Sequence, residues 1–328
     1  MPLLLLSYGF HFLMATRFYF IFILTCLVIF SLIFSLSQGS TYIPFYQLLW
    51  GNSAEWQTIF FDVRLPRTLT AFISGGLLAL SGSLMQLLLQ NPLADPYLLG
   101  VSGSAAFFTL LMMLLGFGEF GLISGAWFGS VLAIILIFFL ARKHRFKSDG
   151  LLISGMAIAC GFSAGISVLL LLSQHDTLHS MLFWLTGDLN DTRMPWFGLF
   201  VLISAWIMTL FLAPGLNVLS RGDIEAKALG LSCSYYRCAL FLLSSLLTAT
   251  AITLSGCIGF IGLIIPHFAR IFAGFDQRIL LPLSMFLGGS LLTIADTLAR
   301  TLFAPQQIPV GVVMALIGVP IFIWLLQQ

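Results

Sequence analysis

Apolar runs long enough to cross a lipid bilayer follow one another along almost the entire chain. Hydrophobic residues fill 59% of the 328 positions and charged residues only 8%, whereas soluble domains carry roughly 25% charged residues. A helix needs about 20 apolar residues to cross the hydrocarbon. The runs therefore predict an all-α polytopic membrane protein and exclude a water-soluble fold. We expect about ten spans, near residues 17–37, 68–90, 96–116, 120–141, 150–173, 195–213, 236–255, 257–272, 279–300 and 309–326, of which 257–272 is short enough to be partial.

The spacing of these runs predicts one domain. No stretch between them is long enough for a separate aqueous domain, so we expect a single transmembrane domain over residues 17–328. Residues 1–16 have the apolar character of a signal peptide but no basic residue ahead of it and no convincing cleavage site. We interpret them as a leader without function, and Met14 is an alternative start to Met1.

The basic residues predict the orientation. Cytoplasmic loops of membrane proteins are enriched in Lys and Arg. With ten spans, ten of the fourteen Lys and Arg fall on one side, and only Arg64, Arg67, Arg193 and Arg300 fall on the other. We therefore expect both termini in the cytoplasm.

A stiff polar turn, QNPLADPYLLG, separates two of the apolar runs. Pro92 and Pro96 fix their own φ angles and disfavour helix at the residue before each. Asp95 is placed to cap a helix that begins near Pro96. These residues alone are equally compatible with a well-made turn and with a functional element.

Four further segments stand out along the chain. RLPR opens the second run, with Arg64 and Arg67 on one face if the segment is helical. RGDIEAKALGLS, 221–232, predicts a short amphipathic stretch. GFIGLIIPHFAR ends at Arg270, and PVGVVMALIGVPIF opens the last run.

These five segments, in this order, resemble the FecCD-type permease subunits of ATP-driven importers for iron–siderophore complexes, haem and vitamin B12. Any one of them is a weak signal, but five in register over residues 64–322 are a strong one. The resemblance implies the fold of a type II ABC importer permease, in a bacterial cytoplasmic membrane, and an import path opened by alternating access. It implies a homodimer whose path is lined largely by the fifth and tenth spans, two cytosolic ATPase subunits and an extracytoplasmic binding protein.

The resemblance also assigns residues to three roles. The gate at the cytoplasmic mouth of the path matches Asn91, Leu93, Lys147, Ser148 and Asp149. The segment that couples to the ATPase matches Gly222, Asp223, Glu225, Ala226, Leu229 and Gly230. The arginines that meet acidic residues of the binding protein match Arg64, Arg67 and Arg300. The family commonly has an acidic residue just before the PVG turn, where this chain has Gln307.

Several kinds of chemistry were weighed against this interpretation. The chain has no GxxxxGK[ST] phosphate loop, so ATP and Mg²⁺ are expected on the partner ATPase and no cofactor or metal on this chain. It has no HExxH motif, and no nucleic-acid partner is expected. His175 and His179 are four residues apart, but a bare HxxxH is more often an exposed helix face than a metal site. The sequence does not identify the transported chelate.

Asp296 supports the main alternative. An acidic residue within a span is a candidate proton carrier, so a proton-coupled secondary transporter is the second hypothesis. A local ion pair with Arg300, at i and i+4, is the favoured interpretation of the same residue.

Overall fold

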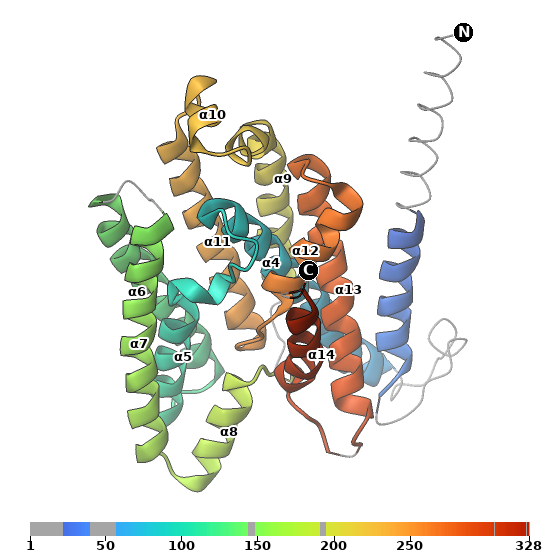
Figure 1. Cartoon of the computed structure of the whole chain (residues 1–328). Helices are drawn as coiled ribbons and strands as arrows, with labels where there is room; N and C mark the ends of the chain where they lie inside the picture. The colour runs from blue at the N-terminus through green and yellow to red at the C-terminus, as the bar shows by residue number, and fades with distance from the viewer. Residues whose placement is uncertain are drawn as a thin grey trace.

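The computed structural model describes residues 22–39, 57–143, 148–190, 195–304, 306–325 and 327, and the regular structure in those ranges is helical throughout (Figure 1). This confirms the all-α prediction. After the unlabelled first helix Phe22–Ser37, the elements are η1 (Thr58–Arg64), α4 (Leu65–Leu89), η2 (Pro96–Leu99), α5 (Val101–Leu114), α6 (Glu119–Lys143), α7 (Ser148–Leu172), α8 (His175–Leu185), α9 (Pro195–Leu219), α10 (Asp223–Ala228), α11 (Cys233–Ser255), α12 (Ile261–Ala273), α13 (Gln277–Thr301) and α14 (Val310–Leu325).

Six helical segments among the described residues are long and apolar enough to cross a membrane: η1 with α4, α6, α7, α9, α11 and α13. Four shorter apolar helices, the first helix, α5, α12 and α14, lie alongside them. The region of α12 matches the short run expected near 257–272. The total of ten spans stays a prediction, because the described parts of these four helices are shorter than the hydrocarbon requires.

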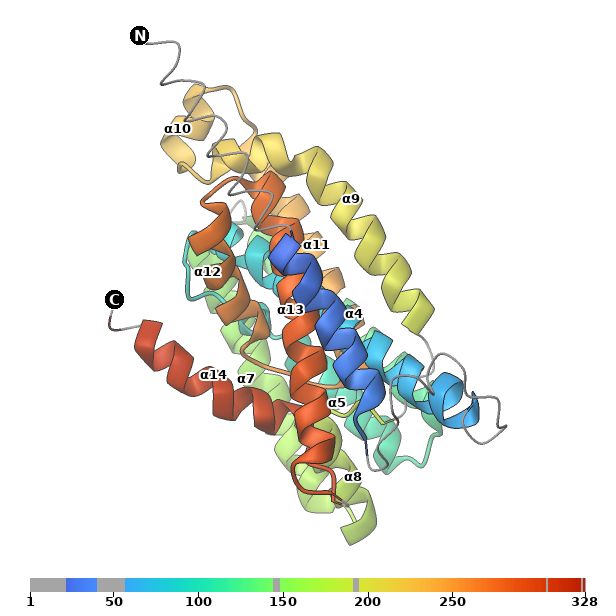
Figure 2. The same ribbon diagram turned by 90° about the vertical axis from the view of Figure 1, so that its right-hand side faces the viewer.

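Helix α4 forms the centre of the bundle, and α7 lies at its edge (Figures 1 and 2). The apolar part of α4 is 94% buried, whereas that of α7 is only 11% buried. Small residues allow the central packing. A Cβ at Gly75 would collide with the backbone of Gly288 on α13, and one at Gly82 would collide with Gly262 on α12. Close backbone approach of this kind is typical of helix packing in membranes.

The bundle has two distinguishable ends. Helix α10 and the turns around it lie at one end, and α8 lies at the other (Figure 1). We call these the α10 end and the α8 end. Each long helix connects the two, so a residue at the start of α4 lies near the α8 end and one at its close lies near the α10 end.

Polar side chains fix α12 against α4. The Gln86 amide nitrogen donates to the Leu263 carbonyl at 3.1 Å. The Arg270 guanidinium donates to the Gln86 side-chain oxygen. Gln86 is therefore satisfied as donor and acceptor in a buried position, which an apolar interior requires.

Candidate functional site

The polar turn after α4 is a compact elbow at residues 90–100. Asn91 accepts a hydrogen bond from the Leu93 backbone N–H at 2.9 Å, which closes the turn. Asp95 accepts from the Tyr97 N–H at 2.8 Å and caps η2, as the sequence predicts. Asn91 and Leu93 are exposed. The elbow thus has a rigid backbone and two side chains that are not committed to the interior.

The elbow is attached to two neighbouring elements. The Ile258 backbone N–H, in the turn between α11 and α12, donates to the Tyr97 hydroxyl at 2.9 Å. Gly100 has φ +74°, and a Cβ there would lie 2.9 Å from the Gly155 carbonyl of α7. Only glycine combines that backbone angle with that approach. Movement of α7 or of the 256–260 turn would therefore displace the elbow as well.

The second predicted gate element lies at the start of α7. This helix begins at Ser148, and Asp149 lies in its first turn, where a carboxylate interacts favourably with the helix dipole. Lys147 lies outside the described residues. The structure therefore brings the elbow against the same helix that carries Ser148 and Asp149.

The predicted coupling segment folds as a short helix, α10, between α9 and α11. Gly222 (φ +109°) precedes it and Gly230 (φ +79°) follows it, both in a region that favours glycine. Ala226 is fully buried, while Ile224 is 87% exposed and Leu229 is 65% exposed. The apolar surface of this segment that is available to a partner is therefore formed by Ile224 and Leu229, whereas Ala226 packs into the bundle.

An ion pair holds α10 against the bundle. Arg237 on α11 donates to the Asp223 carboxylate at 2.6 Å. Glu225 lies in the first turn of α10. Arg237 was assigned no role from the sequence, because its partner is 14 residues away across a turn and no helical spacing rule applies. The pair links α10 to α11 directly.

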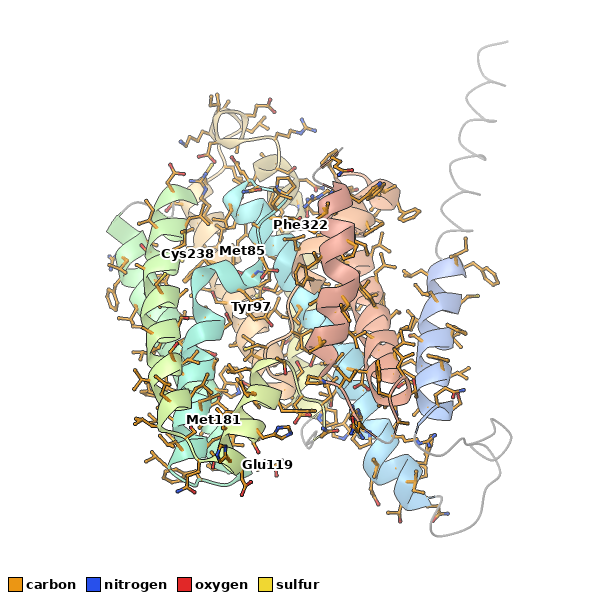
Figure 3. The ribbon with its side chains drawn as sticks, turned by 60° about the horizontal axis from the view of Figure 1, so that its bottom comes forward. Met85, Tyr97, Glu119, Met181, Cys238 and Phe322 are labelled. Carbon is orange, nitrogen blue, oxygen red and sulfur yellow. The ribbon has the colours of Figure 1, made fainter. Side chains whose placement is uncertain are left out.

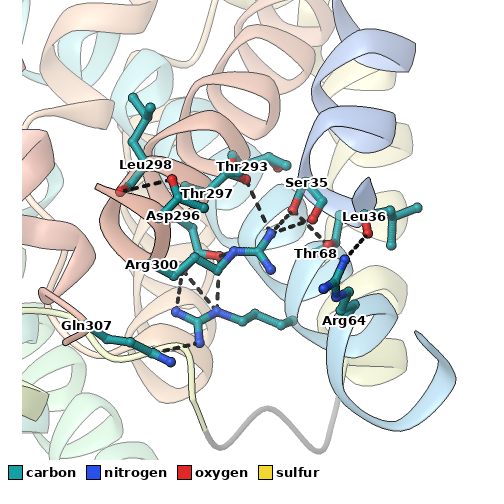
Figure 4. Close-up of polar contacts among 12 residues, drawn as sticks. Ser35, Leu36, Arg64, Thr68, Thr293, Asp296, Thr297, Leu298, Arg300 and Gln307 are labelled. Atoms are coloured by element: carbon teal, nitrogen blue, oxygen red, sulfur yellow. Dashed lines mark hydrogen bonds and ion pairs between the residues drawn. The ribbon is translucent and has the colours of Figure 1, made fainter. Parts of the chain in front are cut away.

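A buried polar cluster occupies the α8 end of α4 and α13 (Figure 4). Asp296 is 0% exposed. Arg67 donates to its two oxygens, from Nη2 at 2.8 Å and from Nε at 3.1 Å. Arg67 also donates to Asn190 at 2.6 Å and to Gln307 at 3.2 Å. The predicted pairing of Asp296 with Arg300 is present at 3.6 Å, but Arg67 is the stronger partner.

The other two predicted docking arginines are turned inward. Arg300 donates to the backbone oxygen of Ser35 at 2.6 Å and to its hydroxyl at 2.7 Å. Arg64 donates to the carbonyls of Leu36 and Ser37 at 2.8 and 3.1 Å. Both arginines are buried. They join the first helix to α4 and α13, while Arg67 extends to Asn190 and Gln307 in the connecting segments at this end.

Two guanidinium groups of this cluster, those of Arg67 and Arg300, share the carboxylate of Asp296. The Gln307 amide approaches Arg67 without adding a negative charge. The surroundings of Arg67 are therefore suited to a further carboxylate, which a guanidinium can bond.

The two histidines lie on α8 without a metal-binding arrangement. His175 begins the helix and His179 follows one turn later, and both are exposed. No group of three or more His, Cys, Asp or Glu among the described residues could hold a metal ion.

Comparison with known proteins shows which family has this architecture. The FecCD transport family matches residues 27–328. The hemin transport system permease protein HmuU of Yersinia pestis is 39% identical over 320 residues, covering 94% of each chain. The vitamin B12 import system permease protein BtuC of Klebsiella pneumoniae is 36% identical over 311 residues, covering 93% of this chain and 92% of its own.

A solved structure agrees in fold. It is described as an inward-facing conformation of a metal-chelate-type ABC transporter, and it superposes with a TM-score of 0.83 at 34% identity. The match covers 94% of this chain and 98% of the other. These comparisons give no support to the proton-coupled alternative.

Proposed function

Since the chain belongs to the FecCD transport family, we propose that it is the membrane-spanning permease subunit of an ATP-driven importer that moves a metal chelate by alternating access. The observation that carries this proposal is the family match, which extends over residues 27–328. The geometry supports it, because a stiff elbow, a short surface helix and an arginine cluster would suit a gate, a docking site for an ATPase and a docking site for a binding protein.

The orientation follows from charge. Arg142, Arg221, Lys227, Arg237 and Arg278 lie in or beside helix ends at the α10 end of the bundle. The described arginines near the α8 end are Arg64, Arg67 and Arg300. By the positive-inside rule, the α10 end faces the cytoplasm of a bacterial cell and the α8 end faces outward. Both termini then lie on the cytoplasmic side.

Helix α10 is the proposed docking element for a cytosolic ATPase. Its exposed Ile224 and Leu229 suit an apolar groove, the usual way in which a short amphipathic helix binds. Asp223, Glu225 and Lys227 surround them and set the register. The ion pair from Asp223 to Arg237 would carry the motion of a docked motor into α11. ATP and Mg²⁺ would be bound by the ATPase, and this chain would need no cofactor.

We place the import path between two copies of the chain, on the side of α7 and α14. Both helices expose large apolar side chains, including Ile153 and Met156 on α7 and Leu316 and Ile323 on α14. The elbow packs against α7 at Gly100. Asn91, Leu93, Lys147, Ser148 and Asp149 would form the cytoplasmic gate of that path.

Arg67 is the proposed contact for an acidic residue of an extracytoplasmic binding protein. A guanidinium bonds a carboxylate through two parallel hydrogen bonds, and Arg67 is the cluster member closest to the surrounding loops. Arg64 and Arg300 would contribute long-range attraction and would hold the first helix in place. Relatives transport hemin and vitamin B12, so the substrate class is a large chelate of iron or cobalt, a ferric siderophore included.

Purification tests the assembly. The tagged chain, extracted in mild detergent from its host, should elute with an ATPase that carries a phosphate-binding loop, one copy per copy of this chain. A matched Ile224→Asp variant should elute without it. Elution of the unaltered chain with no ATPase, repeated after crosslinking, would refute the proposal.

A further inference from the structure

A cavity of about 880 Å³ lies between α5, α6, α8, α9 and α11 at the α8 end of the bundle. None of its lining residues belongs to the elbow, to α10 or to the arginine cluster, and neither α7 nor α14 lines it. Its volume falls within the range of about 300–1,000 Å³ that is typical of small-molecule sites. The cavity is therefore large enough for a ligand and is not accounted for by the proposed path.

Aromatic rings form much of its wall. Trp127 on α6 and Phe197 on α9 meet edge to face with ring centroids 5.9 Å apart. Phe183 and Trp184 contribute from α8. Aromatic faces attract cations when the charge lies within about 6 Å of the ring. The wall therefore suits an organic cation better than an anion.

The charged groups that line the cavity also favour a cation. Three carboxylates line the cavity, those of Glu119, Asp176 and Asp188, and its described lining residues include no lysine or arginine. Asp188 also accepts a hydrogen bond from the Asn190 backbone N–H at 2.9 Å. His179 lies on the same wall, and its ring is tilted against that of Phe183 with the centroids 5.7 Å apart. Carboxylates complement an ammonium group, and an imidazole can donate to a phosphate.

The position of the cavity favours a ligand that comes from the lipid bilayer. Two of its walls, α6 and α9, are helices of membrane-spanning length. Phe120 on α6 and Trp196 and Phe200 on α9 are exposed beside it. Aromatic side chains of this kind gather where lipid headgroups meet the hydrocarbon. Glu119 lies at the α8 end of the bundle in Figure 3, as this arrangement requires.

We propose that this cavity binds a phospholipid whose headgroup ends in a primary ammonium. The ammonium would lie among the aromatic rings and the carboxylates, with Asp176 as its main partner. The phosphate would lie toward His179, and the acyl chains would extend along α6 and α9. The proposal does not depend on the transport function, because it rests on the cavity alone.

Native mass spectrometry of the purified full chain tests the proposal. The protein is titrated with phosphatidylethanolamine and with phosphatidylglycerol of identical acyl chains. We expect phosphatidylethanolamine to bind about tenfold more tightly, a difference of about 1.4 kcal/mol. Asp176→Asn and Glu119→Gln should each reduce that preference several-fold, and Asp176→Glu should retain it.

Asp62→Asn provides the matched control. Asp62 is exposed on η1, which precedes α4 at the α8 end, and does not line the cavity. Its neutralisation should leave lipid binding unchanged. Equal binding of the two lipids, or a preference that survives both Asp176→Asn and Glu119→Gln, would overturn the proposal. Displacement of the lipid by water-soluble phosphoethanolamine would show that the site recognises a free amine, and would overturn the assignment to lipid.

Discussion

Asp296 shows how one charged side chain is accommodated inside an apolar bundle. Its carboxylate is fully buried and receives hydrogen bonds from Arg67 on a different helix. Breaking a buried ion pair by removing one partner costs about 3–5 kcal/mol, because the remaining charge is left uncompensated. Asp296 therefore has a structural role that does not require proton transfer.

Asp296→Asn should therefore destabilise the protein severely. We expect a lower midpoint of thermal unfolding in detergent, corresponding to a loss of about 3–5 kcal/mol. The reason is that Arg67 and Arg300 would lose the carboxylate they share. Asp62→Asn, the same change at an exposed position, should leave the midpoint unchanged. An Asp296→Asn variant as stable as the unaltered protein would contradict this account of the cluster.

Tyr97→Phe tests the attachment of the elbow. The change removes the hydroxyl that accepts from the Ile258 N–H and leaves that donor without its partner. A buried donor without a partner costs about 1–3 kcal/mol, so the unfolding midpoint should fall measurably. Tyr235→Phe is the control, because Tyr235 is exposed on α11. Equal midpoints for the two variants would show that the hydroxyl does not stabilise the elbow.

Helix α10 is held to the rest of the chain by few contacts. It has six residues, and the described structure attaches it through the buried Ala226 and the pair between Asp223 and Arg237. A helix this short is not stable alone. Its flanking glycines set its position, and its exposed apolar residues suit a docking element that needs a partner.

Ile224→Asp should uncouple the permease from its ATPase. A charge at this apolar position would have to be desolvated on docking, so we expect at least a tenfold loss of affinity in a titration of the purified subunits. Phe139→Ala on α6, another exposed apolar residue, should bind the ATPase normally. Unchanged affinity of the Ile224→Asp variant would exclude α10 as the docking helix.

The helices and the local caps could be predicted from the sequence, while the contacts between helices could not. Hydropathy depends on the residues of one segment, so the positions of α6, α9 and α13 follow from it. Asp95 caps η2 by accepting from the Tyr97 N–H two residues away, and Asp296 pairs with Arg300 four residues away. Local spacing rules predicted both interactions. Arg67 and Asp296 are 229 residues apart, and no spacing rule relates them.

The exposure of the residues in the coupling segment could not be predicted from the sequence either. The family resemblance assigned Ala226, with Leu229, to the segment that couples to the ATPase. The structure buries Ala226 and exposes Ile224, and this difference depends on how α10 packs against its neighbours, which its own residues do not specify. The roles of the gate residues and of the docking arginines stay predictions.

For the molecule as a whole, the exposed surface of α7 is the place where we propose that a second copy packs. Its apolar segment is only 11% buried, and Gly161 has open space around it. A second copy packed on this side would cover the helix by a two-fold axis, the commonest symmetry of oligomers.

Two native cysteines allow this arrangement to be measured. Cys160 on α7 and Cys26 on the first helix are both exposed in one chain. In variants that keep one of them, spin labels at Cys160 should give a shorter distance between copies than labels at Cys26, by pulsed electron paramagnetic resonance. A shorter distance at Cys26, or none at either position, would contradict a dimer through α7.

The most direct test of the central claim is uptake by proteoliposomes that contain this chain with its co-purified subunits, supplied with the binding protein and its chelate. We predict uptake that requires ATP hydrolysis and persists when a protonophore removes the proton gradient. Uptake driven by a proton gradient without ATP, and lost in an Asp296→Asn variant that still folds, would contradict it.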